Sequence, residues 1–468
     1  GRSGKLFTII KIDEVSNLGA VRIRLRSLKA AMEAQDRHPE KICEGLYKPN
    51  PFTRDMREKY TILAPQMAPI QFELLQEAIC SEGYNLEVLR TVDREDIETG
   101  LKYVNNDSCY PSIIVIGQLV RALQSGKYDV DKTAVIITQT GGPCRASNYL
   151  GLLKRALKTA GFGKVPVISA SVTSLANNKD LQVSLPLIRK ALMAVLYGDL
   201  LMALTLKTRP YELIKGSTDR IYKKWMDKLK GDLRNGDRDI FRKNVFEIVN
   251  DFDNLPVKNE QKPKVGLVGE ILVKYHPAAN NNMAELIEGM GAELVVPGLI
   301  YFFLFCAYGG ETEYRYLGGS WLKKAACNAF IKFVEHYHGV IREALAQSRR
   351  FNPPATIDEL ARMAEPFLSI CNRSGEGWLL TAEMVELIEG GVNNIICMQP
   401  FACLPNHISG RGMVKQIKEA YPQANILTID YDPGASEVNQ INRIRLMLER
   451  AGFQPVGNEQ DYNIKIPI

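Results

Sequence analysis

Apolar residues follow two alternating patterns in the first third of the chain. Short apolar runs, typical of strands buried inside a parallel sheet, occur at 60–64, 85–89, 134–138 and 165–169. Segments with helical periodicity separate these runs, among them 70–82 and 148–160, and a glycine follows each of the two. Strands that alternate with helices predict a parallel sheet covered by helices on both faces.

A second region with the same alternation begins at residue 264. Further strand-like runs follow at 292–296, 394–398 and 425–429, and helical patterns at 283–290, 412–421 and 437–451. Between the two regions the pattern is helical. We therefore expect an α/β protein with two Rossmann-like parallel-sheet domains and helical insertions. The expected parts are an N-terminal arm and linker (1–59), a first α/β domain (60–185), a helical connector (186–262) and a second α/β domain with a helical insertion (263–468).

Length and charge restrict the classes of protein that fit. A chain of 468 residues is too long for one ordinary core. The net charge of +6 is small for this length, so we expect neither nucleic acid nor a membrane surface as a partner. The most apolar stretch, 294–307, is too short to span a bilayer and contains Pro297. No signal peptide is visible, which favours the cytoplasm, and the missing initial Met suggests a fragment or a tag remnant.

Nine cysteines are present, and three of them stand at loop-to-helix entries. Cys403 and Cys144 each follow a predicted strand, and Cys109 directly precedes a predicted helix. Open α/β sheets bind their ligands outside the carboxyl ends of strands. The odd count and the absence of C-x-x-C argue against a disulfide framework and a zinc knuckle. We expect the three thiolates to converge and to hold an iron–sulfur cluster, because thiolates suit iron.

A glycine turn precedes the second of these cysteines. Gly141 and Gly142 allow backbone N–H groups to approach an anion, and a helix start adds positive potential near Cys144 and Arg145. Both effects favour a thiolate. A phosphate-binding loop is the rival interpretation, although the spacing of a P-loop is missing. A purely structural turn is the third.

Polar residues near other predicted element ends complete the candidate site. Glu270 and Glu376 each follow a glycine and suit acid–base chemistry or binding of a substrate amide, with structural turns as the alternative. His407 lies four residues after Cys403, in a predicted loop. It would act near the cluster or would only cap the following helix. We count the following residues as substrate contacts: Gly141, Gly142, Arg145, Asn406 and His276.

Six stretches together resemble the C-terminal region of the large acyl-CoA dehydratase activase-related proteins, within the 2-hydroxyacyl-CoA dehydratase and double-cubane cluster superfamily. The resemblance covers about residues 6–450. It rests on YTILAPQM (60–67), YVNNDSCYP (103–111), TQTGGPCRASNY (138–149), VGEILVK (268–274), GEGW (375–378) and QPFACLPNH (399–407).

The resemblance implies a cofactor and partners. In the dehydratases, three cysteines per subunit hold a four-iron four-sulfur (4Fe-4S) cluster with one iron open to substrate, and the matching positions are Cys109, Cys144 and Cys403. A separate or fused actin-like ATPase, the activator, injects a low-potential electron. A related branch holds a double-cubane 8Fe-9S cluster with six cysteines, for which the spare candidates are Cys43, Cys371 and Cys397.

The function expected from this resemblance is low-potential reduction in an anaerobic cytoplasm. The chain would be a 2-hydroxyacyl-CoA dehydratase-like lyase or the component of an ATP-dependent reductase, acting on an acyl-CoA or a small molecule, with a homodimer as a possible assembly. The opposing interpretation is a non-catalytic electron-transfer module of a larger complex.

Overall fold

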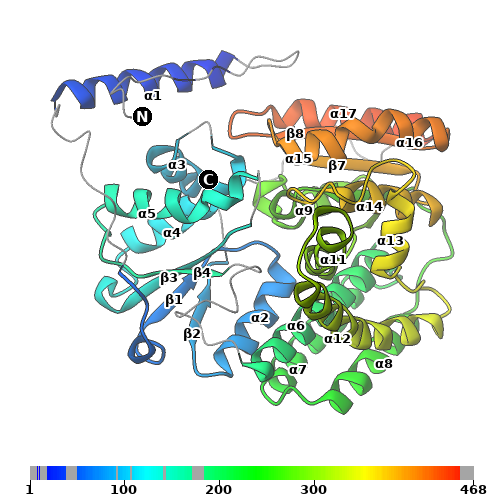
Figure 1. Ribbon diagram of the computed structural model, residues 1–468. Coiled ribbons are helices and arrows are strands. Elements are labelled where there is room, and N and C mark those ends of the chain that lie inside the picture. Colours follow the sequence, from blue (N-terminus) through cyan, green and yellow to red (C-terminus); the bar gives the residue numbers. More distant parts are fainter. Residues whose placement is uncertain are drawn as a thin grey trace.

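The structure is a computed structural model that describes residues 8, 10, 18–37, 50–90, 93–105, 108–140, 144–170 and 184–453. It contains two four-stranded, all-parallel sheets with helices packed around them, which confirms the expected α/β class (Figure 1). Most of the strand expected near residues 6–13, and the linker with Cys43, lie outside the described residues.

The first sheet has the order β2-β1-β3-β4. Its strands are β1 (Thr61–Ala64), β2 (Asn85–Val88), β3 (Thr133–Thr138) and β4 (Val167–Ala170). Its helices are α2 (Pro69–Cys80), α3 (Arg94–Tyr103), α4 (Tyr110–Gln124) and α5 (Tyr149–Thr159), with short 3-10 turns η2 (Arg54–Met56), η3 (Val130–Lys132) and η4 (Arg145–Asn148). Helix α3 starts with a capping box formed by Asp93 and Asp96.

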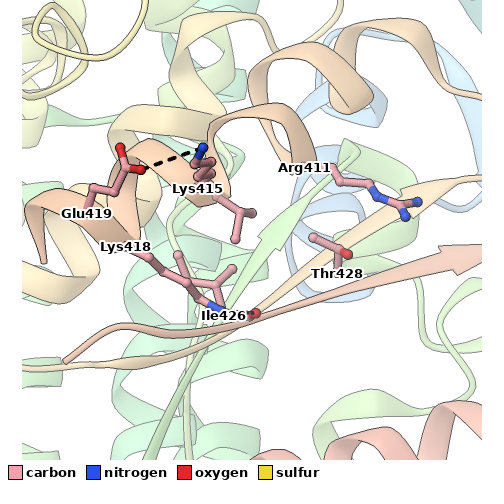
Figure 2. Close-up of a pocket in the computed structure, with 7 residues that line it drawn as sticks. Arg411, Lys415, Lys418, Glu419, Ile426 and Thr428 are labelled. Atoms are coloured by element: carbon pink, nitrogen blue, oxygen red, sulfur yellow. Dashed lines mark hydrogen bonds and ion pairs between the residues drawn. The ribbon is translucent and has the colours of Figure 1, made fainter. Parts of the chain in front are cut away.

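The second sheet repeats this order as β6-β5-β7-β8. Its strands are β5 (Lys264–Gly269), β6 (Glu293–Val295), β7 (Asn394–Pro400) and β8 (Asn425–Tyr431). In both sheets the chain adds its second strand on one side of the first strand and then crosses to the other side. The resulting switch points lie between β1 and β3 and between β5 and β7. The edge strand β8 borders a surface groove beside the helical segment that precedes it, residues 411–420 (Figure 2).

Helices connect the sheets and cover the second one. The connector contains α6 (Leu185–Thr208), η6 (Arg209–Tyr211), α7 (Ser217–Leu233) and α8 (Arg238–Asp253), and α1 (Leu18–Arg37) precedes the first sheet. The remaining elements are α9 (Ile271–Tyr275), η7 (Pro277–Ala279), α10 (Met283–Gly289), α11 (Ile300–Leu317), α12 (Trp321–Ala346), α13 (Ile357–Ala364), α14 (Trp378–Glu389), α15 (Leu404–Ser409), η8 (Arg411–Met413), α16 (Val414–Ala420) and α17 (Glu437–Arg450).

Two helical boundaries differ from the sequence prediction. The helical pattern of residues 211–233 predicts a start at 211, but helix α7 begins at Ser217, because Gly216 adopts the left-handed conformation with φ of 82°. Helix α15 occupies a segment expected to be a loop, since six residues are too few for a visible period. In the described part of the chain, none of the helices combines the length and apolar composition needed to cross a membrane.

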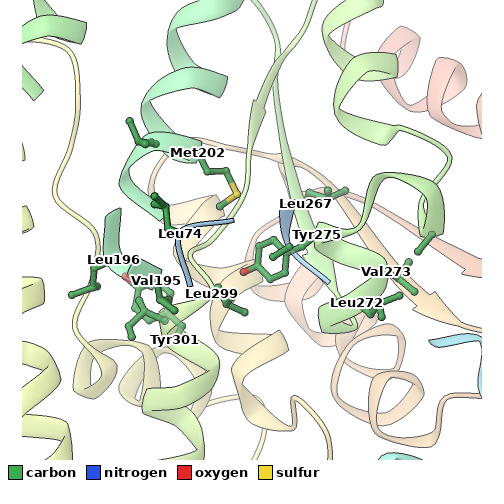
Figure 3. Packing of buried hydrophobic residues seen from close by; sticks show 14 of the residues in the cluster. Leu74, Val195, Leu196, Met202, Leu267, Leu272, Val273, Tyr275, Leu299 and Tyr301 are labelled. Atoms are coloured by element: carbon green, nitrogen blue, oxygen red, sulfur yellow. The ribbon is translucent and has the colours of Figure 1, made fainter. Parts of the chain in front are cut away.

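Helix α6 ties the two sheets together. Val195, Leu196 and Met202 on α6 belong to one buried cluster with Leu74 of α2 and Tyr275 of α9 (Figure 3). Burial of apolar surface in such a cluster stabilises the folded state by about 25 cal/mol per Å² removed from water.

Inside this cluster α6 also carries a buried carboxylate, Asp199. It accepts hydrogen bonds from the Gln71 side chain (2.8 Å) and from the backbone N–H groups of Leu299 and Ile300 (3.0 and 2.9 Å). Burial raises the pKa of Asp199 to about 6, and these hydrogen bonds oppose the rise. The residue joins α2, α6 and the start of α11, so it fixes the switch points relative to each other.

Candidate functional site

The three predicted cysteines lie near one another. Cys109 raises the pKa of the Cys144 thiol, and Cys144 raises that of the Cys403 thiol, so each of these pairs is close enough for an electrostatic effect. Each is the N-cap residue of a helix or 3-10 turn, namely α4, η4 and α15, and none makes a side-chain capping hydrogen bond. The three segments that carry these cysteines are far apart in sequence, and the Cys109 sulfur already contacts the hydroxyl of Tyr149.

Cys109 is positioned by the start of α4 and by α5. Its Sγ lies 2.8 Å from the hydroxyl of Tyr149, the first residue of α5. Burial raises the pKa of the Cys109 thiol, and the Tyr149 hydrogen bond opposes that rise. Sequence reasoning missed Tyr149, because nothing local to α5 indicates a partner on α4.

Cys144 enters the site from the carboxyl end of β3. Burial raises the pKa of its thiol to about 11, and the negative charges of Glu376 and Cys109 raise it further. In the same loop Arg145 is exposed, while Gly141 and Gly142 lie outside the described residues.

Cys403 sits on a tight turn after β7. The Cys403 N–H donates to the carbonyl of Pro400 (3.0 Å), and Ala402 adopts φ of +58°, a left-handed conformation that costs an L-residue about 1–2 kcal/mol. Burial raises the pKa of the Cys403 thiol strongly, followed by the effect of Glu376.

Glu270 and Glu376 lie beside the thiols and cap one short helix. Glu270 accepts a hydrogen bond from the backbone N–H of Val273 (2.9 Å), and Glu376 accepts one from Ile271 (3.1 Å). Burial raises the pKa of Glu270 to about 8, and the charge of Glu376 raises it further. Burial also raises the pKa of Glu376. Two such carboxyls retain a proton between them near neutral pH.

Gly269 makes this arrangement possible. Its φ of +147° is rarely adopted by L-residues, and a Cβ at this position would lie 1.9 Å from the carbonyl oxygen of Met398 on β7. Glycine therefore lets β5 and β7 stay paired up to the switch point, so that the next residue, Glu270, turns into the site.

The remaining predicted site residues are His407, Asn406 and His276. His407 lies in α15, with Nδ1 2.8 Å from the carbonyl oxygen of Cys403 and Nε2 3.9 Å from Asp430. Asn406 is completely buried. His276 is buried at the opposite end of α9 from Glu270, and neither ring nitrogen has a hydrogen-bond partner among the described residues. Burial lowers the pKa of His276 to about 4, so its imidazole is neutral.

A buried ion pair supports the carboxyls and was not predicted. Lys274 of α9 donates to both carboxylate oxygens of Glu383 on α14, at 2.9 and 3.1 Å, and both side chains are almost completely buried. A void of about 10 Å³ lies between this pair, Glu376 and Gly269. It has room for about one water molecule. The ion pair, the void and Glu376 therefore form one continuous buried polar region.

Two buried polar atoms at the strand ends lack partners. Among the described residues, the Oε1 atom of Gln399 and the hydroxyl of Tyr431 form no hydrogen bond. Tyr431 interacts electrostatically with Tyr110, the residue after Cys109. Buried polar atoms of this kind commonly meet water or a ligand.

The candidate donor set consists of thiols and carboxyls. In the part of the chain that the structure describes, no three His, Cys, Asp or Glu side chains are close enough to hold one metal ion. The site combines three thiols and two carboxyls whose pKa values are all raised. A cationic cluster core would compensate their charges when their protons leave.

Comparison with known proteins identifies no family. No protein-family model matches the chain, and no curated protein matches it. The family resemblance therefore rests on the six sequence stretches alone.

Proposed function

We propose that Cys109, Cys144 and Cys403 hold a four-iron four-sulfur cluster with one open iron, in a protein of the 2-hydroxyacyl-CoA dehydratase type. The convergence of three N-cap cysteines from three distant segments is the observation that carries this proposal. When bound, such a cluster supplies a low-potential electron and an electrophilic iron at the substrate.

The chain's own residues would tune and protect this centre. A thiolate sulfur can only accept, so the Tyr149 hydroxyl, 2.8 Å from the sulfur of Cys109, would donate to it, and hydrogen bonds to cluster sulfurs favour the reduced state. The left-handed Ala402 and the turn before Cys403 hold the third thiolate in place. All three cysteines are partly buried, which limits access of water and oxygen to their sulfurs.

Glu270 and Glu376 would transfer the protons that the dehydration requires. Dehydration of a 2-hydroxyacyl group removes one proton from carbon and releases the hydroxyl as water, which needs one proton at oxygen. A carboxyl with a pKa of about 8 retains its proton at neutral pH and can donate it to the leaving hydroxyl. Its neighbour Glu376, once ionised, can accept a proton in return.

The partners follow from this chemistry. The electron would come from an ATP-dependent, actin-like activator, and the substrate would be an acyl-CoA or another small molecule that is reduced. Cys397 is packed in an apolar cluster beneath Gly410, and Cys371 is exposed. This packing favours one cluster with three cysteine ligands over a double-cubane cluster.

Anaerobic purification tests the proposal directly. We expect brown protein that contains iron and acid-labile sulfide, with an EPR signal after reduction. Colourless protein without iron after anaerobic reconstitution would contradict it. Turnover of a 2-hydroxyacyl-CoA with an activator would separate the enzyme from a non-catalytic electron-transfer module, which would accept electrons without turnover.

A further inference from the structure

A cationic groove lies at the edge of the second sheet, outside the cysteine site. It has a volume of about 570 Å³ and runs between α16 and the edge strand β8. Figure 2 shows Arg411, Lys415 and Lys418 on one side and Ile426 and Thr428 on the strand. This volume is within the range of small-molecule sites.

The charge of the groove is positive. Arg411, Lys415 and Lys418 are spaced by four and three residues, which places them along one side of η8 and α16. The acid in the lining, Glu419, reaches Lys415 only at 3.9 Å. The Arg411 guanidinium contacts Asp430 at 3.4 Å, so it is anchored at one end of the groove.

The surroundings of Lys418 favour the binding of an anion next to its ammonium group. Its Nζ donates to the carbonyl of Ile426 at 3.4 Å, and no carboxylate among the described residues pairs with it. Burial lowers the pKa of Lys418, and the positive charge of Arg450 lowers it further. Val414 and Ile426 add an apolar wall on which the organic body of a ligand can rest.

The groove leads to the cysteine site. Ile426, Thr428 and Asp430 lie on one face of β8, because side chains alternate along a strand, and successive members are roughly 7 Å apart. Asp430 accepts a hydrogen bond from Gln399 (2.7 Å) and faces His407, four residues after Cys403. A molecule in the groove could therefore extend toward the thiols.

We propose that this groove binds a small organic molecule with two or more phosphate groups. Cations spread along the groove suit several phosphates, and an Arg fork can hold one of them through two hydrogen bonds. This chemistry is shared by free nucleotides and by the phosphorylated part of a coenzyme A thioester. With coenzyme A as its occupant the inference rests on the proposed function, whereas a nucleotide would occupy the groove independently of it.

Isothermal titration calorimetry of the purified protein at low salt tests the groove with ADP, coenzyme A and sulfate as probes. We expect salt-sensitive binding of ADP or coenzyme A, and about tenfold weaker binding by the Lys415→Gln/Lys418→Gln variant, because two charge contacts are lost. The matched control is Lys332→Gln, an exposed lysine on α12, which should bind like the wild type.

The outcomes separate the sources and can overturn the inference. Tighter binding of coenzyme A than of ADP identifies the thioester carrier, and similar affinities identify a nucleotide. Unchanged affinity in the double variant, or no binding of either probe, overturns the site. Sulfate binding as tight as that of ADP would indicate an adventitious ion only and would also overturn it. Iron content is measured on the same samples, so the cluster proposal is judged independently.

Discussion

Glu270 and Glu376, which are 106 positions apart in the sequence, both cap helix α9 and share one buried polar environment. Glu270 comes directly after β5, and Glu376 comes from a loop between two left-handed glycines, Gly375 and Gly377. The pair lies beside the three thiols at the switch points of both sheets. Because the two carboxyls lie beside the thiols, they would exchange a proton at the place where a cluster held by the thiolates would supply an electron.

The raised pKa of Glu270 predicts a pH-dependent stability. The folded protein keeps this proton up to a pH of about 8, whereas the unfolded chain releases it near the ordinary pKa of 4.5. The unfolded state therefore binds fewer protons in this window, and the free energy of unfolding falls as the pH rises through it. Glu270→Gln should lose less stability between pH 5 and pH 8 in urea denaturation. Glu98→Gln on the exposed side of α3 is the control, and an unchanged slope for Glu270→Gln would contradict the assignment.

Removal of one proposed ligand should remove iron. We expect Cys403→Ser to retain less iron and sulfide than the wild type after anaerobic reconstitution. Cys80→Ser is the matched control, because the Cys80 thiol only donates to the carbonyl of Leu86 (3.4 Å) in the first domain, which a serine hydroxyl can also do. Equal iron in the two variants would disprove the ligand assignment.

The Tyr149 hydrogen bond should influence the redox potential. Tyr149→Phe removes a donor to the sulfur of Cys109 while keeping the ring in place, so iron content should stay and the reduction potential should become more negative. Protein-film voltammetry or an EPR-monitored titration measures the shift. Tyr128→Phe, whose hydroxyl bonds Glu87, should show no shift. Identical potentials in all three proteins would exclude the proposed contact with the cluster.

His407 should support Cys403 without binding iron. His407→Ala removes the contact between its Nδ1 and the Cys403 carbonyl, so we expect a loss of stability of about 1 kcal/mol, retained iron and an altered EPR signal or turnover. Iron analysis and EPR of the reduced variant provide the measurement. Loss of iron would instead make His407 a direct ligand, and a variant identical to wild type would leave it without a role.

Gly269 should tolerate no side chain. In Gly269→Ala the new Cβ would lie 1.9 Å from backbone oxygen, so we expect several kcal/mol of destabilisation in chemical denaturation. Gly126→Ala is the control, because Gly126 also has a positive φ but an added Cβ meets nothing within 4 Å. It should lose only about 1–2 kcal/mol, from backbone strain. Equal losses in the two variants would show that the close approach of β5 and β7 is not limiting.

Local sequence patterns determined much of this protein. The apolar runs predicted the strands of both sheets, because burial on both faces leaves few polar positions in a parallel strand. The cap at Asp93 and the cysteines at helix starts were equally visible, since capping depends on residues only three or four positions apart. These signals identified the segments that carry the candidate site.

The tertiary structure alone decided which of these segments meet. Contacts such as those between Cys109 and Tyr149, Lys274 and Glu383, or Asp199 and Leu299 join residues at least 40 positions apart, and no local period encodes them. The tertiary structure also brings Glu270, which follows β5, close enough to Cys109 and Cys403 to raise the pKa of their thiols. Such pairings depend on how the buried faces of α6 and the two sheets fit together. A pattern of residues along the chain determines which faces are apolar, and packing in three dimensions selects their partners.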